Sequence, residues 1–285
     1  MSKQQSRPAN AGKKSSDFRR IITALIALPI LIASILIQKL LALFVLLAMA
    51  AMVAGLFEFW VLARRREIKA DAALGYLGAV GLFTAFIFND PLLLLMLLPS
   101  LTIAVLTAAM LRGAPFEKML ASTGATLLGV FYVVLLGGHL VAVRTGFDQT
   151  LSAHLLSFFF LVIMGSDTGA YYTGRALGRR KLAPAISPGK TWEGAVGGML
   201  ASLLLATLAH FWFFRELPLK WALPLAAVMN VLGVLGDLTE SALKRGAGAK
   251  DAASILPGHG GLLDRLDSLL FNAPLIYYFG RIYFQ

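Results

Sequence analysis

Apolar runs long enough to cross a lipid bilayer recur along the chain, and short polar connections separate them. A hydrocarbon core of about 30 Å needs about 20 residues of helix, because backbone polar groups in lipid must be satisfied within the segment itself. Hydrophobic residues make up 58% of the 285 residues and charged residues 14%, whereas soluble domains are about half apolar and a quarter charged. The sequence therefore predicts an all-α, polytopic integral membrane protein.

About nine segments are predicted to be transmembrane helices. They cover about 21–38, 40–62, 72–89, 91–111, 121–143, 152–174, 193–214, 221–242 and 265–283. Gln38-Lys39 and Asn89-Asp90-Pro91 are predicted to be tight turns between neighbouring helices. The last segment differs from the others because it opens on the charged cluster Asp264-Arg265-Leu266-Asp267.

The positive charge is distributed as in a membrane protein rather than a nucleic-acid-binding protein. The net charge is +11, but the bases lie in short loops beside apolar runs and form no continuous face. Cytoplasmic loops carry the excess of Lys and Arg. A cytoplasmic N-terminus with nine spans puts most of the 26 bases on that side, including the loops 175–192 and 243–264. No nucleic-acid partner is expected.

Polarity divides the chain into three predicted regions. Residues 1–20 form a disordered basic arm on an anionic membrane surface. Residues 21–145 form a transmembrane scaffold, and residues 146–285 form a transmembrane catalytic region that contains the polar clusters. Glu58 is the polar exception in the scaffold, where it either pairs with a nearby arginine such as Arg64 or has a role that the residues alone do not assign.

The densest polar stretch runs from Gly236 to Asp267 and holds five of the 15 acids of the chain. On a helix Asp237, Glu240 and Lys244 share one face, together with Ser241. Asp264 and Asp267 share a face of the next helix by the same spacing. Two carboxylate faces on either side of a basic loop suit a hard cation such as Mg²⁺, with phosphate oxygens completing the coordination.

A second polar cluster precedes the seventh predicted span. Asp167 follows a long apolar run, where a carboxylate is costly unless it is paired, hydrated or metal-bound. It either pairs with Arg175 or joins the acidic site. The Gly189-Lys190-Thr191 sequence is no P-loop, because position 184 is proline where that motif needs glycine. Thr191 is instead a candidate N-cap, and Lys190 near the helix start favours anion binding.

The composition also excludes some chemistry. The chain has no cysteine and four scattered histidines, which excludes a thiolate site and argues against zinc. His259, between glycines, is left with three roles: donating to a phosphate, assisting proton transfer, or fixing the turn.

The polar stretch resembles the signature of the phosphatidate cytidylyltransferases, the integral membrane CDP-diacylglycerol synthases. The matching residues are Ser241, Leu243, Lys244-Arg245, Lys250-Asp251, Ala253, Leu256-Pro257, His259-Gly260-Gly261-Leu262 and Asp264-Arg265-Leu266-Asp267. Further similar elements are Ser166-Asp167-Thr168-Gly169-Ala170-Tyr171, Ser187-Pro188-Gly189-Lys190-Thr191-Trp192-Glu193-Gly194 and, more weakly, Glu58-Phe59-Trp60.

The resemblance implies that CTP and phosphatidic acid react to give CDP-diacylglycerol and pyrophosphate. The expected partners are these substrates and the bilayer of a bacterial inner membrane, with the active site facing the cytoplasm. A homodimer is compatible with the sequence. Because the lipid phosphate is already anionic near neutral pH, the site needs charge neutralisation and alignment more than a strong base.

We expect Asp237 and Asp264 to bind one or two Mg²⁺ ions, with Asp267 and Asp167 as further ligands or supporting groups. A second, different cation is compatible with this site. The residues expected to be catalytic are Asp237, Asp264, Asp267 and Lys244. The residues expected to bind substrate are Lys190, Ser241, Arg245, Lys250, His259 and Arg265.

Two other classes of function remain open from the residues. One is another CTP-using membrane lipid kinase, which would transfer the γ-phosphoryl group. The other is a transporter of a phosphorylated or cationic solute that uses the buried acids as an ion path. Acids spread across both leaflets would favour the transporter, whereas here they gather at one set of helix ends.

Overall fold

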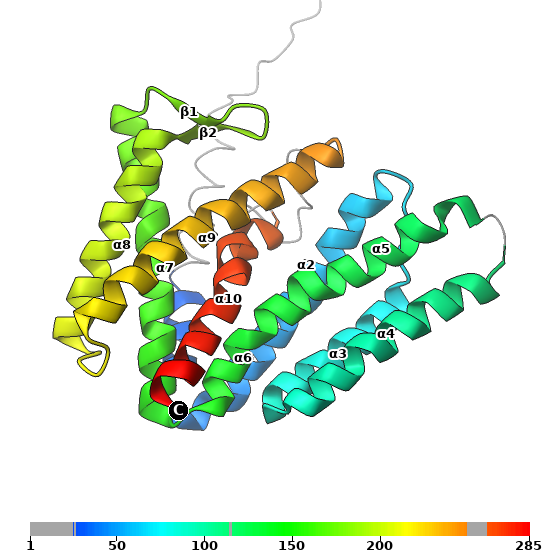
Figure 1. The fold of residues 1–285 in the computed structure, drawn as a ribbon, viewed down its shortest axis with the longest axis horizontal. Helices are drawn as coiled ribbons and strands as arrows, with labels where there is room; N and C mark the ends of the chain where they lie inside the picture. The colour runs from blue at the N-terminus through cyan, green and yellow to red at the C-terminus, as the bar shows by residue number, and fades with distance from the viewer. Residues whose placement is uncertain (1–24, 26, 114–115, 250–260) are drawn as a thin grey trace, which may run out of the picture.

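The computed structural model describes residue 25 and residues 27–113, 116–249 and 261–285, and it is helical almost throughout (Figure 1). The arm 1–20 lies outside the described residues. A first helix, Ala27–Leu36, precedes the labelled elements. These are η1 Gln38–Leu40, α2 Leu41–Arg64, α3 Ala72–Phe88, α4 Pro91–Leu111, η2 Phe116–Lys118, α5 Met119–Gly129, η3 Val130–Leu135, α6 Leu136–Gly146, α7 Gln149–Leu177, β1 Lys181–Ala183, β2 Ser187–Thr191, α8 Trp192–Trp212, α9 Leu219–Gly246 and α10 Leu263–Phe284.

The all-α polytopic class is confirmed. Each segment predicted to span the membrane coincides with a helix or a continuous helical run in the described part of the chain. Six of these are long and apolar enough to cross a membrane by length and composition. The number of spans, nine, and the cytoplasmic N-terminus remain predictions.

Short polar side chains determine where several helices begin. A helix start leaves backbone N–H groups without intrahelical acceptors. Asp90 accepts from Leu93 N at 3.0 Å, with Pro91 at the first helical position, and Asn89 adopts left-handed backbone (φ 50°) in the predicted tight turn. Thr191 caps α8 by accepting from Gly194 N at 3.1 Å, which confirms its predicted role. Asp71 and Asp148 cap α3 and α7 in the same way.

The helices pack around two apolar cores. In Figure 1, α7, α8 and α9 lie together on one side, α3, α4 and α5 lie on the other, and α2, α6 and α10 lie between them. One core centres on residues of α2, α3 and η3 such as Leu56, Leu82 and Val133. The other centres on α7 and α9 and includes Phe159 and Met229. The central position of α10 brings it against both groups of helices.

One face of α8 is suited to lipid and the other to close helix packing. Val196, Leu200, Leu204 and Leu208 are exposed at four-residue intervals, which forms an apolar stripe along the helix. On the packed face, a Cβ added at Gly169 of α7 would lie 3.0 Å from the carbonyl oxygen of Gly197. Small residues permit such close approach between membrane helices.

The connection between α7 and α8, which the sequence predicted only as a basic loop, forms a two-stranded antiparallel hairpin. Lys181 pairs with Thr191, and Ala183 pairs with Ser187. The hairpin lies beyond the ends of α7 and α8, at the edge of the molecule towards which α9 runs (Figure 1). It therefore brings Lys190 near the end of α9.

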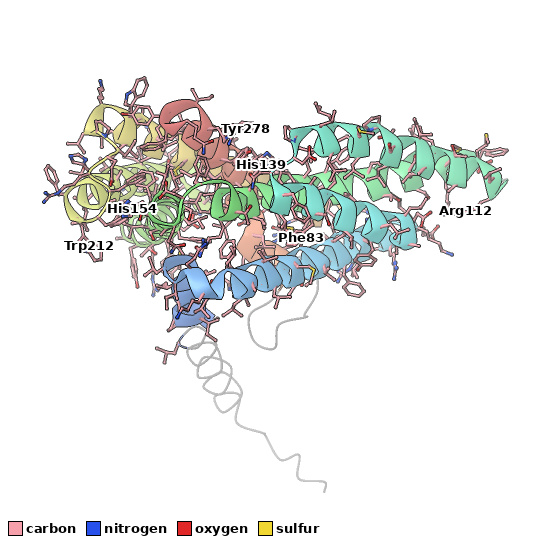
Figure 2. The ribbon with its side chains drawn as sticks, turned by 90° about the horizontal axis from the view of Figure 1, so that it is seen from below. Phe83, Arg112, His139, His154, Trp212 and Tyr278 are labelled. Atoms are coloured by element: carbon pink, nitrogen blue, oxygen red, sulfur yellow. The ribbon has the colours of Figure 1, made fainter. Side chains whose placement is uncertain are left out.

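The run from Met119 to Gly146 contains a π-helical segment, Val130–Leu135. Such segments interrupt the regular hydrogen-bond pattern and are frequent at functional sites. Just beyond it, the ring of buried His139 lies 5.4 Å from that of Tyr278 of α10. Figure 2 shows these two residues in the middle of the molecule, with Trp212 and Arg112 at opposite ends. The buried ring of His139 thus packs against α10.

Candidate active site

Two acidic helices meet at one end of the bundle. α9 ends where α10 begins, and the two helices run in opposite directions (Figure 1). Asp237 and Glu240 are three residues apart on α9, and Asp264 and Asp267 are three residues apart on α10. Because the directions are opposed, Glu240 lies by Asp264, and Asp237 is close enough to Asp267 to interact electrostatically.

Lys244 joins the two helices at their ends. Its Nζ lies 2.6 Å from Glu240 Oε2 and also forms an ion pair with Asp264. The Glu240 side chain is only 1% exposed, so the pair is removed from water. The other oxygen of Asp264 accepts from Gly261 N at 3.1 Å. Lys244 and Asp264, both predicted site residues, are thus in direct contact.

Lys190 connects the hairpin to α9. Its Nζ lies 2.6 Å from Asp237 Oδ2, and Ser241 Oγ donates to the other oxygen of Asp237 at 3.3 Å. Arg245 of α9 donates from Nε to the carbonyl of Ile186, in the hairpin turn, at 3.4 Å. The two charged loops that were predicted to share one side of the membrane are therefore in contact with each other.

Asp167 and Asp267 complete the acidic cluster. Asp267 is 8% exposed and accepts from Ser268 N at 2.6 Å. Asp167, on α7, interacts electrostatically with Asp237 and Lys190. Arg175, the alternative partner of Asp167, donates instead to the Tyr171 hydroxyl at 3.2 Å. Carboxylates of two other helices, α7 and α10, thus lie near Asp237 of α9.

The cluster holds lysines rather than a preformed ion cage. Among the described residues, no group of three or more His, Asp and Glu side chains lies close enough to hold a metal ion. Arg265 is exposed on the first turn of α10. Lys250 and His259, two further predicted substrate-binding residues, lie outside the described residues.

Three residues near the cluster were absent from the predicted site. Glu240 shares the predicted acidic face but was not assigned a role. Glu58 was left open, and it accepts backbone hydrogen bonds from the start of α10 rather than pairing with Arg64. Tyr132, in the π-helical segment, is buried near Asp267 with a hydroxyl that has no hydrogen-bond partner in the described structure. Its only sequence signal is the polar group itself, because a π-helical turn has no distinctive pattern.

Gly236 allows α9 and α10 to approach closely at the level of the cluster. A Cβ at this position would collide with the backbone carbonyl of Asp267 and lie 3.3 Å from the Phe271 ring. We expect Gly236→Ala to destabilise the protein by about 1–3 kcal/mol through overpacking, measured by unfolding in detergent. Gly124→Ala is the matched control, since nothing lies within 4 Å of an added Cβ there. Equal stability of the two variants would contradict the prediction.

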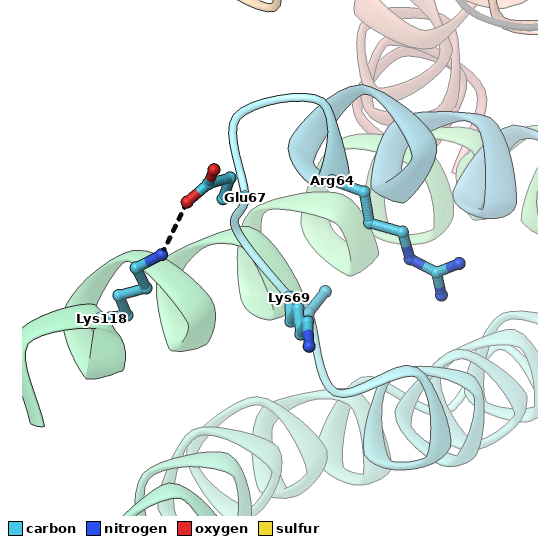
Figure 3. Close-up of a pocket in the computed structure, with 5 residues that line it drawn as sticks. Arg64, Glu67, Lys69 and Lys118 are labelled. Carbon is cyan, nitrogen blue, oxygen red and sulfur yellow. Dashed lines mark hydrogen bonds and ion pairs between the residues drawn. The ribbon is translucent and has the colours of Figure 1, made fainter. Parts of the chain in front are cut away.

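A basic pocket lies away from the acidic cluster. It is lined by Arg64, Glu67, Lys69, Ala70 and Lys118, at the end of α2 and the start of the α5 run (Figure 3). Lys118 Nζ lies 3.0 Å from Glu67 Oε2, and both side chains are largely exposed. The pocket contains none of the carboxylates of α9 or α10, so it is separate from the candidate site.

Comparison with known proteins identifies the family. The Cytidylyltransferase family matches residues 18–283. The chain is 33% identical to a phosphatidate cytidylyltransferase of Bacillus subtilis over 280 residues, which cover 91% of this chain and 96% of that protein. It is 45% identical to the phosphatidate cytidylyltransferase of Haemophilus influenzae over 129 residues, or 44% of this chain and 45% of that protein. With a match that includes α2 to α10 and every described residue of the acidic cluster, the chain belongs to the cytidylyltransferase family.

Proposed function

We propose that the protein transfers the cytidylyl group of CTP to phosphatidic acid, giving CDP-diacylglycerol and pyrophosphate. Family membership over residues 18–283 supports a nucleotidyl transfer, and the relatives named phosphatidate cytidylyltransferase indicate the lipid acceptor. The observation that carries the proposal is the convergence of Lys190, Lys244 and Asp264 with the acids of α9 at one end of a membrane helix bundle.

In this reaction, an oxygen of the lipid phosphate attacks the α-phosphorus of CTP, and the bond to the β-phosphate oxygen breaks to release pyrophosphate. Both reactants are anionic, so the site must reduce their repulsion and align the attacking oxygen. Lys190 and Lys244 are suited to this because each carries a mobile cationic group that can move from a carboxylate to a phosphate. Arg245 and Arg265 lie on the adjoining helix ends.

A role for Mg²⁺ is part of the proposal. Carboxylate oxygens are the ligands that Mg²⁺ prefers, and Asp237, Asp267 and Asp167 offer them from three helices, so the donor chemistry fits. In the described structure these carboxylates are not close enough together to hold an ion, so they would have to draw together around it. Asp264 is a fourth candidate ligand, next to Lys244. A bound Mg²⁺ would supply charge neutralisation for the phosphates. For Asp237 to bind an ion, Lys190 must leave the carboxylate that it contacts at 2.6 Å.

We further propose that the cluster faces the cytoplasm and that phosphatidic acid enters from the bilayer. The hairpin, the end of α9 and the start of α10 lie on the same side of the molecule (Figure 1), and the basic loops on that side follow the expected charge bias. CTP is available on the cytoplasmic side. The bacterial relatives are in keeping with a bacterial membrane.

Labelled CTP tests the reaction. Purified protein in detergent, with phosphatidic acid and Mg²⁺, is expected to transfer label from the α-phosphate of CTP into the lipid fraction. Label from the γ-phosphate is expected to leave with pyrophosphate, because the β–γ unit is the leaving group. Lipid labelled only from γ-labelled CTP would indicate a kinase instead. Absence of any labelled lipid from a folded preparation would contradict the proposed function.

A further inference from the structure

The first turn of α10 has no cap from its own N-cap residue. Leu262 occupies that position and its side chain accepts no hydrogen bond, although a helix start needs acceptors for its first N–H groups. Two carboxylates supply them. Asp264 reaches back to Gly261 N at 3.1 Å, and Glu58 of α2 accepts from Leu262 N at 2.9 Å and Leu263 N at 2.7 Å.

The burial of the Glu58 carboxylate is unfavourable by itself, and its hydrogen bonds compensate for it. Its side chain is fully buried, and a buried carboxylate is strongly unfavourable unless it is well hydrogen-bonded. Both of its oxygens are used, and its negative charge lies at the positive end of the α10 dipole. A serine or aspartate at position 262 would cap the helix locally. The cap from Glu58 differs from such a local cap because it also attaches the start of α10 to a different helix, α2.

The turn that follows α2 contacts the end of α9. Arg66 follows α2, and its Nε donates to the carbonyl of Gly246, the last residue of α9, at 2.6 Å. A cation on the carbonyl end of a helix complements the dipole there. Glu58 and Arg66 are eight residues apart, and α2 ends between them at Arg64. Within one short segment, therefore, an anion binds the start of α10 and a cation binds the end of α9.

These contacts lie next to the acidic cluster. Glu58 binds the two backbone groups that immediately precede Asp264, and Arg66 binds the carbonyl two residues after Lys244. The ion pair between Lys244 and Asp264 depends on the relative placement of α9 and α10. One segment, α2 together with the turn that follows it, contacts both helix ends, and it does so independently of the chain that joins them.

We propose that Glu58 is a positioning residue for the transfer reaction, and that it acts by holding Asp264 against Lys244. Arg66 has the corresponding role at the end of α9. The proposal rests on the proposed role of Asp264 in the site. Neither residue needs to touch a substrate for this role.

Glu58→Gln tests this positioning role with little change in the shape of the side chain. The amide offers one acceptor and one donor to two N–H groups, so a hydrogen bond and the negative charge are lost together. We expect kcat to fall roughly 10- to 100-fold, the range for residues that orient the groups of a site through hydrogen bonds without touching the substrate. The KM for CTP should change much less, because the lost interaction is not a substrate contact. Glu67→Gln is the matched control, since Glu67 lies in the turn after α2 and contacts Lys118 instead.

Hydrogen exchange provides a readout that does not depend on activity. Amides of residues 261–266 should exchange faster in Glu58→Gln than in the unchanged protein, while amides in the middle of α9 should not. Unchanged exchange at 261–266, or unchanged kcat, would overturn the proposal. If Glu58→Gln does not fold, Arg66→Ala is measured instead. Faster exchange of amides 243–246 together with a lower kcat would support the positioning role. No change in exchange or in kcat would overturn it.

A double-variant cycle separates this proposal from the proposed function. If Glu58 acts through Asp264, Glu58→Gln should lower kcat far less in an Asp264→Asn background than in the unchanged protein. Equal, additive effects would overturn the positioning role. Full activity of Asp264→Asn alone would instead overturn the proposed role of Asp264, and the exchange measurement would still decide whether Glu58 holds α10.

Discussion

Asp264→Asn is expected to lower the turnover number by at least about 10²-fold, the scale for losing one electrostatic stabilising group in an active site. The substitution keeps the shape of the side chain but removes the negative charge that faces Lys244. It therefore removes a carboxylate that can bind a cation, and it releases Lys244 from its charged partner on α10. Initial rates of α-label transfer at saturating CTP and phosphatidic acid measure the effect.

Asp90→Asn is the matched control for this experiment. Asp90 caps α4 by accepting from Leu93 N, a contact that asparagine also makes well, and it lies outside the acidic cluster. We expect Asp90→Asn to keep nearly full activity. If Asp264→Asn keeps full Mg²⁺-dependent activity as well, Asp264 is not part of the reaction.

Lys244→Met is expected to destabilise the fold by about 3–5 kcal/mol, the cost of removing one partner from a buried ion pair. The Lys244 side chain is 13% exposed, and its partners Glu240 and Asp264 are 1% and 20% exposed. Methionine fills much of the lysine volume, so the main loss is the charge. The free energy of unfolding, measured in detergent with denaturant, reports the change.

Two further variants show whether the charge is the cause. Glu240→Gln in the Lys244→Met background should recover part of the lost stability, because it removes the carboxylate left unpaired. Lys118→Met removes a lysine from an exposed pair with Glu67 and should have little effect, since exposed pairs contribute little. A Lys244→Met variant as stable as Lys118→Met would show that the buried pair contributes no net stability.

Much of the fold could be predicted because its signals are local. Apolar length identified the helices, and residues such as Asp90 and Thr191 identified where two of them begin. The hairpin was missed because its strands are short and include Pro188, which does not favour a ladder position. The π-helical turn at Val130–Leu135 was missed because it changes the hydrogen-bond pattern without changing the residue pattern.

The candidate site was predictable within each helix and less so between helices. The spacing of Glu240 and Lys244 predicted their shared face, which the ion pair confirms. Their pairing with α10 follows from the antiparallel packing of neighbouring helices. By contrast, the contact of Glu58 with Leu262 joins positions 204 residues apart, and no periodicity in the sequence relates them. The roles proposed for these residues in the reaction remain predictions.

If Lys190 binds a nucleotide phosphate and Asp237 binds a cation, as proposed, the ion pair between these two residues makes the two binding steps interdependent. A nucleotide phosphate that draws Lys190 away leaves a bare carboxylate, which then attracts a divalent ion more strongly. By thermodynamic reciprocity, an ion that occupies Asp237 frees the ammonium group for phosphate and tightens nucleotide binding by the same factor. Binding of the nucleotide and of the cation would thus be cooperative, and either one alone would bind weakly.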